Sequence, residues 1–130
     1  MNTKLVMSAS GLAMGVTGIV LSFLPHEVVN YFSGSQASAL DAVVVQILGA
    51  LYFAFAMTNW AAKANLIGGI YGRPIAIGNL CHFMMAALAL TKAYFASHLA
   101  ILLVPMIVYG LFAVLFAIIL FTHPVKEVNN

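Results

Sequence analysis

The sequence predicts an all-α integral membrane protein, an antiparallel bundle of four transmembrane helices, and three observations lead to that prediction. Only 6% of the residues are charged and 64% are hydrophobic, whereas soluble domains average about 25% charged and 45–50% apolar residues. The charged residues leave four uncharged runs, at 5–26, 42–62, 74–91 and 93–125. Each run is close to or above the roughly 20 apolar residues that cross a bilayer core of about 30 Å. The chain is therefore predicted to form a single transmembrane domain, 1–130.

The first predicted helix covers about residues 5–24, after Lys4 and before Pro25. Its apolar core is longer than the roughly 7–15 residues of a cleavable signal peptide, so it is interpreted as an uncleaved span. Small residues recur along it at spacings of three and four. They are Ser8, Gly11, Gly15, Gly18 and Ser22. Such stripes let helix backbones approach closely in lipid, so this face is predicted to pack against another helix.

A short helix near 25–33 is expected to lie at the membrane interface. Pro25 suits the first turn of a helix, Glu27 suits the positive end of its dipole, and Gly34 suits its termination. Its valines and aromatic residues give the segment enough apolar surface to rest on lipid. The prediction is therefore a surface helix between the first two spans.

The second span is predicted at 39–62, because Ser38 and Asp41 resemble a capping box. Residues on one face of it follow alternating spacings of four and three: Val45, Gly49, Tyr52, Ala56, Asn59 and Lys63. Gln46, about 11 Å deep by the helical rise, is interpreted as a hydrogen-bond partner for a neighbouring helix.

The third span is predicted at 75–95, after Pro74, and the fourth at 99–121, before Pro124. Pro105 lies six residues into the fourth predicted span, where it would release a backbone carbonyl and permit a kink. A small-residue seam is expected on each helix. On the fourth it consists of Met106, Gly110, Ala113 and Ala117.

Basic residues near the helix ends predict the orientation. A cytoplasmic N-terminus places Lys4, Lys63, Arg73 and Lys126 inside and leaves Lys92 outside. Lysine and arginine are enriched in cytoplasmic loops, so this arrangement is favoured. We therefore expect a multi-pass protein of the inner (plasma) membrane with both termini in the cytoplasm.

Polar side chains within the spans predict the candidate site. Asn59 lies about 5 Å from the end of the second helix, while Asn79 and His82 lie about 6 and 11 Å from the start of the third. The two asparagines could therefore meet on the cytoplasmic side, with His82 one turn deeper and Lys63 and Arg73 above them. Two interpretations stay open. One is a hydrogen-bond clamp between helices, and the other is a ligand or proton site that uses the imidazole.

The segment 65–74 holds three glycines, Tyr71 and Arg73 before a helix-start proline. Amide groups that lead into a helix N-terminus can hold an anion, and an arginine beside them suits a phosphate or carboxylate. The simpler interpretation is a tight cytoplasmic hairpin. No nucleotide-binding fingerprint is present in its spacing.

Several kinds of chemistry are not expected. Cys81 is single, so an intrachain disulfide is excluded, and it is interpreted as a small buried residue. No histidine spacing suits a metal, and a haem between His82 and His123 would have to join positions differing in depth by about 10 Å. No cofactor is therefore predicted. The scattered basic residues also argue against a nucleic-acid partner.

The preferred functional prediction is a membrane protein of binding or accessory type, either a homo-oligomer or a subunit of a membrane complex. Its predicted partners are the lipid bilayer and an anionic or lipid-like small ligand. An oligomeric transporter or channel for a small substrate is the alternative, and a membrane enzyme acting on a lipid or quinone is the third. The size and four spans resemble the small multidrug transporters, but their buried glutamate has no counterpart in residues 5–24.

Overall fold

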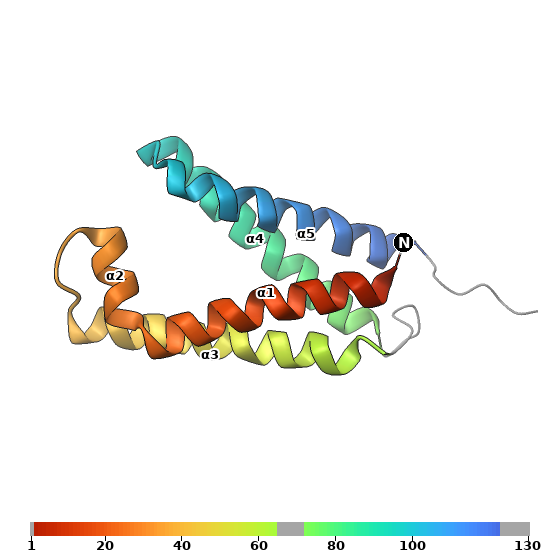
Figure 1. Ribbon diagram of the computed structural model, residues 1–130. Coiled ribbons are helices and arrows are strands. Elements are labelled where there is room, and N and C mark those ends of the chain that lie inside the picture. Colours follow the sequence, from red (N-terminus) through yellow and green to blue (C-terminus); the bar gives the residue numbers. More distant parts are fainter. Residues whose placement is uncertain (1, 65–71, 123–130) are drawn as a thin grey trace, which may run out of the picture. The chain divides into compact units, whose positions relative to one another are not determined.

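The computed structural model describes residues 2–64 and 72–122, and over this range the regular structure is helical (Figure 1). The elements are α1 (Thr3–Phe23), α2 (Pro25–Ser33), α3 (Ala39–Ala62), α4 (Arg73–Ser97), a 3-10 turn η1 (Ala100–Leu102) and α5 (Leu103–Phe121). Four of them are long and apolar enough to cross a membrane: α1, α3, α4, and η1 together with α5. The all-α prediction with four long apolar helices is confirmed.

The helix boundaries follow the local signals in the sequence. α2 and α3 begin and end where predicted, while α4 extends two residues further at each end than the predicted 75–95. At α3 the Ser38 hydroxyl accepts a hydrogen bond from the Asp41 backbone N–H at 3.2 Å, and Asp41 Oδ2 accepts one from the Ser38 backbone N–H at 3.1 Å. The predicted capping box is thus confirmed. It provides acceptors for two backbone N–H groups that have no acceptor within the helix.

Pro105 lies in the first turn of α5 and not inside a longer helix, so it releases no carbonyl of that helix. Pro105 is the third residue of α5, because the preceding residues Ala100–Leu102 form the separate turn η1. The first four N–H groups of an α-helix have no acceptor within the helix, so a proline in the first turn removes no hydrogen bond. Proline here marks the start of a helix.

The chain forms two compact units. One comprises Met7–Lys63, and the other comprises Met1–Val6 with Ala64–Asn130. We call them the α1–α3 unit and the α4–α5 unit, and each is described by itself. The prediction of one domain over 1–130 stays a prediction.

Within the α1–α3 unit, α1 and α3 run antiparallel and pack through their small residues (Figure 1). A Cβ atom placed on Gly18 would lie 2.7 Å from the backbone nitrogen of Phe53 and 2.9 Å from the carbonyl oxygen of Gly49. A Cβ atom on Gly49 would lie 2.7 Å from the backbone nitrogen of Ser22. Only hydrogen fits at these two positions. The predicted packing face of the first helix is confirmed for its glycines.

The α4–α5 unit is a helical hairpin held by aromatic rings. Phe83 of α4 stacks on Phe112 and Phe116 of α5, with ring centroids 4.9 and 5.6 Å apart, and meets Tyr109 edge-on at 5.4 Å. His98, with φ of 53°, ends α4 in the left-handed conformation, and its N–H donates to the Tyr94 carbonyl at 2.7 Å. The close turn lets α5 return along α4.

The face of α5 that contacts α4 carries aromatic rings. They are Tyr109, Phe112 and Phe116, at spacings of three and four. The small-residue seam of the fourth predicted span stays a prediction. A Cβ atom placed on Gly110 would meet nothing within 4 Å. Large rings fill this hairpin, so its helices need no glycine contact.

Candidate functional site

Asn59 is the central polar residue of the α1–α3 unit. Its side chain has no exposed surface, and Nδ2 donates a hydrogen bond to the Ser10 hydroxyl of α1 at 3.0 Å. Ser10 in turn donates to the backbone carbonyl of Met7 at 3.1 Å. The Nδ2 atom also lies 3.9 Å from the sulfur of Met14. These bonds form a buried chain from α3 to the backbone of α1.

The close approach of the helices at Gly11 explains why these hydrogen bonds can form. A Cβ atom on Gly11 would lie 3.3 Å from the carbonyl oxygen of Ala56 and 3.5 Å from the Cβ atom of Asn59. The helices are therefore close enough for a short asparagine to reach across. Within the α1–α3 unit, Asn59 thus forms a hydrogen-bond clamp to Ser10 of α1, whereas the predicted clamp between Asn59 and Asn79 stays a prediction.

Ser10 is a partner of Asn59 that the predicted stripe of small residues leaves out. That stripe runs through Ser8, and Ser10 lies beside it. A signal is present in the sequence, because Met7, Ser10 and Met14 recur at spacings of three and four, and all three are buried in the structure. One face of the helix thus carries both the glycines and this second row.

Gln46 provides a second link between the same helices. Its Nε2 atom donates to the backbone carbonyl of Ser22 at 3.4 Å. The interpretation of Gln46 as a hydrogen-bond partner for a neighbouring helix is confirmed. Asn59 and Gln46 thus join α3 to α1 near opposite ends of the pair.

Lys63 caps the end of α3, and its ammonium group lies over the ring of Trp60, 2.9 Å from the ring centroid. Half of the Trp60 surface is exposed. The contact is a cation–π interaction between residues three apart on one helix. In membrane proteins, tryptophan is enriched at the membrane–water interface and lysine in cytoplasmic loops near the helix ends.

The other three predicted site residues lie along α4. Arg73 is its exposed first residue, and Asn79 is buried, with Nδ2 donating to the Ile75 carbonyl at 2.9 Å. The His82 ring lies against Phe83 and Tyr109, with centroids 5.2 and 6.0 Å apart. His82 therefore joins the aromatic contact with α5, and Asn79 lies three residues earlier on α4.

The predicted pocket draws Asn59 and Lys63 from one unit and Arg73, Asn79 and His82 from the other. Their convergence stays a prediction. The proposed anion-binding segment falls mostly on 65–71, and the haem pairing needs His123. Both lie outside the described residues.

Two expectations about reactive groups can be compared with the structure. Cys81 is exposed on α4, so its interpretation as a buried residue is wrong. Its position in the third span did not reveal which side of the helix it occupies. Among the residues that the structure describes, no three or more His, Cys, Asp or Glu side chains come together as a metal site would require.

No protein-family model, curated protein or solved structure matches this chain. Its class is therefore defined by its own fold, a helical protein with four helices able to span a membrane.

The bond between Asn59 and Ser10 predicts a measurable coupling energy. In a double-mutant cycle with Asn59→Ala and Ser10→Ala, we expect a coupling of about 0.6 kcal/mol, the average for hydrogen bonds between membrane helices. The free energy of unfolding is measured for each variant in a detergent titration that is monitored by circular dichroism. Thr58→Ala is the control, because the Thr58 hydroxyl donates only within its own helix, to Ala54 at 2.9 Å. A coupling of zero for Asn59 and Ser10 would contradict the clamp.

Proposed function

We propose that the protein is a multi-pass integral membrane protein of binding or accessory type, with four spans in one bundle and both termini in the cytoplasm. The observation that carries the membrane assignment is the surface of the long helices, where large apolar side chains are exposed on every one of them. Examples are Leu12, 65% exposed, Ile47, 58%, Met85, 63%, and Val104, 68%. A soluble protein rarely exposes so much contiguous apolar surface, whereas lipid favours it.

The polar groups of the long helices support the same assignment. Ser10, Asn59 and Asn79 are buried. The threonine hydroxyls donate to carbonyl groups four residues earlier on their own helix: Thr17 to Ala13, Thr58 to Ala54 and Thr91 to Ala87. Polar groups in a bilayer must find partners within the protein, and this pattern supplies them.

The binding or accessory role rests on how the interior side chains are used. The glycines of α1, the Asn59–Ser10 bond and the Phe83 ring cluster all hold helices together. A protein furnished mainly for packing suits a role in which it binds a partner or a ligand. We propose a homo-oligomer or a larger membrane complex as its context. Lys63 and Arg73, at helix ends assigned to the cytoplasm, favour an anionic or lipid-like ligand.

The proposed topology makes a direct prediction for cysteine labelling. In a Cys81→Ser background we expect Gln36→Cys to react with a membrane-impermeant maleimide added to intact cells, because the α2–α3 loop is assigned to the outside. Asn130→Cys should react only after the membrane is opened, because the C-terminus is assigned to the cytoplasm. In the unsubstituted protein, Cys81 should resist the maleimide in both conditions, because it lies on a helix that is proposed to be surrounded by lipid. Labelling of Asn130→Cys in intact cells would contradict the orientation.

The binding role is tested by native mass spectrometry of protein released from mild detergent. The expected result is a complex that retains a second copy, a partner subunit or a lipid. Substituting Lys63→Gln and Arg73→Gln should reduce any retained anionic lipid, whereas Lys92→Gln, on the opposite side, should not. A bare monomer without a retained partner or ligand would count against the binding role.

A further inference from the structure

The helix α2 has two chemically distinct faces. Pro25, Val28, Val29 and Phe32 follow the helical spacing of three, one and three and share one face. The opposite side carries polar residues: His26, Glu27, Asn30 and Ser33. A nine-residue helix with such a division has an apolar side that needs cover and a polar side that needs water.

Within the α1–α3 unit, neighbouring residues cover only the first part of the apolar face. Pro25 is buried, and Val28 and Val29 are half-buried, since α2 packs against α3. Phe32, one turn further along the same face, is 56% exposed, and its neighbour Tyr31 is 71% exposed. The two rings meet edge-on, with centroids 5.4 Å apart. The α1–α3 unit thus leaves the Phe32 ring at the end of the face uncovered, and Tyr31 lies beside that ring at the edge of the face.

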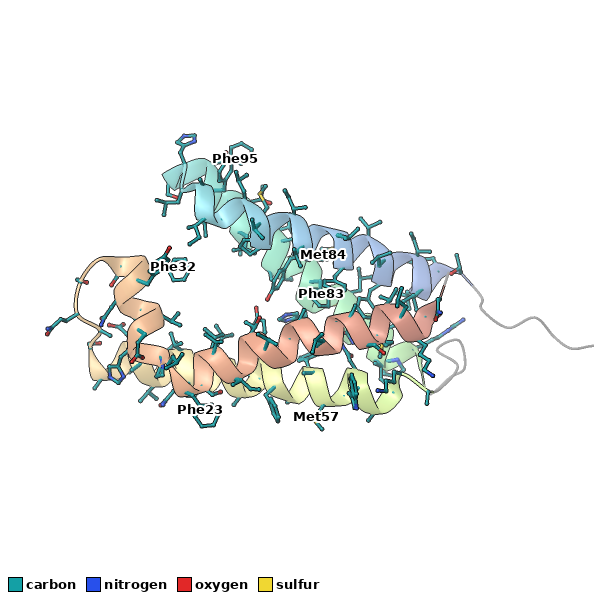
Figure 2. The ribbon with its side chains drawn as sticks, in the orientation of Figure 1. Phe23, Phe32, Met57, Phe83, Met84 and Phe95 are labelled. Atoms are coloured by element: carbon teal, nitrogen blue, oxygen red, sulfur yellow. The ribbon has the colours of Figure 1, made fainter. Side chains whose placement is uncertain are left out.

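The direction of α2 indicates what covers the Phe32 ring. The chain breaks helix geometry at Leu24, with ψ of 44°, and α2 then turns steeply away from the line of α1 and α3 (Figure 1). If α1 and α3 cross the bilayer, α2 lies along its surface. The Phe32 side chain projects from α2 on the side toward which α1 and α3 extend, the side on which the bilayer lies (Figure 2).

Local hydrogen bonds hold α2 in this position. Gly34 ends the helix in the left-handed conformation, with φ of 65°, and its N–H donates to the Asn30 carbonyl at 3.0 Å. The Asn30 side chain accepts a hydrogen bond from the backbone N–H of Ala37 at 2.6 Å. The capping box at Ser38 follows directly. The loop is therefore tied to both helices, and it fixes the apolar face of α2 relative to the spans.

We propose that α2 is a lipid-binding surface that inserts Phe32 into the outer leaflet, with Tyr31 beside it at the boundary between headgroups and acyl chains. Interfacial helices bury their apolar face about 5–10 Å below the headgroup level. The segment 25–38 contains Glu27 and no lysine or arginine. The attraction is therefore apolar, and the lipid partner need not be anionic. This inference rests on the proposed membrane function, since it takes α1 and α3 as spans.

The test places a fluorophore on each face of α2 in the full-length protein, reconstituted into phosphatidylcholine vesicles. Trp60→Phe removes the only tryptophan of the chain. Phe32→Trp then reports on the apolar face, and His26→Trp serves as the matched control on the polar face. Lipids brominated near the headgroup end of the acyl chain quench a tryptophan at that depth. We expect a large loss of Phe32→Trp fluorescence with these lipids and a much smaller loss for His26→Trp.

Exchanging part of the phosphatidylcholine for anionic phosphatidylglycerol should leave the quenching unchanged. Quenching of Phe32→Trp by aqueous iodide would show a water-exposed ring and overturn the proposal. Resistance to both brominated lipid and iodide would show that protein, such as a second copy of the chain, covers the ring. That result would also overturn the proposal. Retention of the variants in vesicles after alkaline extraction tests membrane integration separately, so failure of the α2 proposal is distinguishable from failure of the proposed function.

Discussion

We expect Gly49→Val to separate α1 from α3 and to produce the largest loss of stability among single substitutions in the α1–α3 unit. Any side chain at this position must displace the backbone of α1, because its Cβ atom would lie 2.7 Å from the Ser22 nitrogen and 2.9 Å from the Gly18 carbonyl oxygen. Forcing carbon into a well-packed contact costs about 1–3 kcal/mol, and the branched valine adds two further methyl groups to the clash. The measurement is the midpoint of unfolding in a detergent titration.

The chain offers a matched control for this substitution. Gly110 is also a helical glycine, but a Cβ atom there would meet nothing within 4 Å. Gly110→Val should therefore change the midpoint little. Ser22→Ala provides a second comparison, because it removes the Ser22 hydroxyl near Gly49 but leaves the backbone contacts in place. Ser22→Ala should not rescue Gly49→Val, and a full rescue would show that the hydroxyl alone sets the close approach.

The second large effect is expected for Phe83→Ala in the α4–α5 unit. Phe83 is 1% exposed and stacks on two rings of α5, so its removal leaves a cavity between the helices. Truncation of a buried phenylalanine costs about 3–5 kcal/mol in soluble proteins. We expect a value of about 3 kcal/mol here, because lipid already solvates apolar groups and only the packing contribution is lost.

Phe95→Ala is the matched control for Phe83→Ala, since it truncates the same residue type on the same helix. Phe95 is 67% exposed, so its removal leaves no internal cavity. The two variants are compared by unfolding in detergent and by cross-linking between cysteines placed on α4 and α5. Equal losses for Phe83→Ala and Phe95→Ala would contradict the aromatic cluster as the main contact of the hairpin.

The local elements of the fold could be predicted closely from the sequence. α2 and α3 have the predicted boundaries because the start and stop residues, Pro25, Gly34 and the Ser38 capping box, act within one helical turn. The extents of the four long apolar helices follow closely from the uncharged runs of the sequence. Such signals depend on neighbours in sequence and not on the rest of the fold.

The candidate site was predicted less completely. Asn59 was identified as a buried polar residue, but its partner Ser10 was not, and the aromatic rings through which α5 contacts α4 were not singled out. Both omissions concern the choice of a packing face. In a water-soluble helix the apolar side marks that face. In these helices large apolar side chains are found on the exposed sides as well, so apolar periodicity does not distinguish a side that meets another helix from one that does not.

The number and extent of the apolar helices and the caps of α2 and α3 follow from the order of the residues alone. The meeting of Gly18 with Gly49, the reach of Asn59 to Ser10 and the central place of Phe83 in the α4–α5 hairpin emerge only from the folded arrangement. The physical reason is the distance over which each signal acts. Helix length and capping depend on residues within a few positions, whereas helix pairing depends on the fit between surfaces that are dozens of residues apart in the chain.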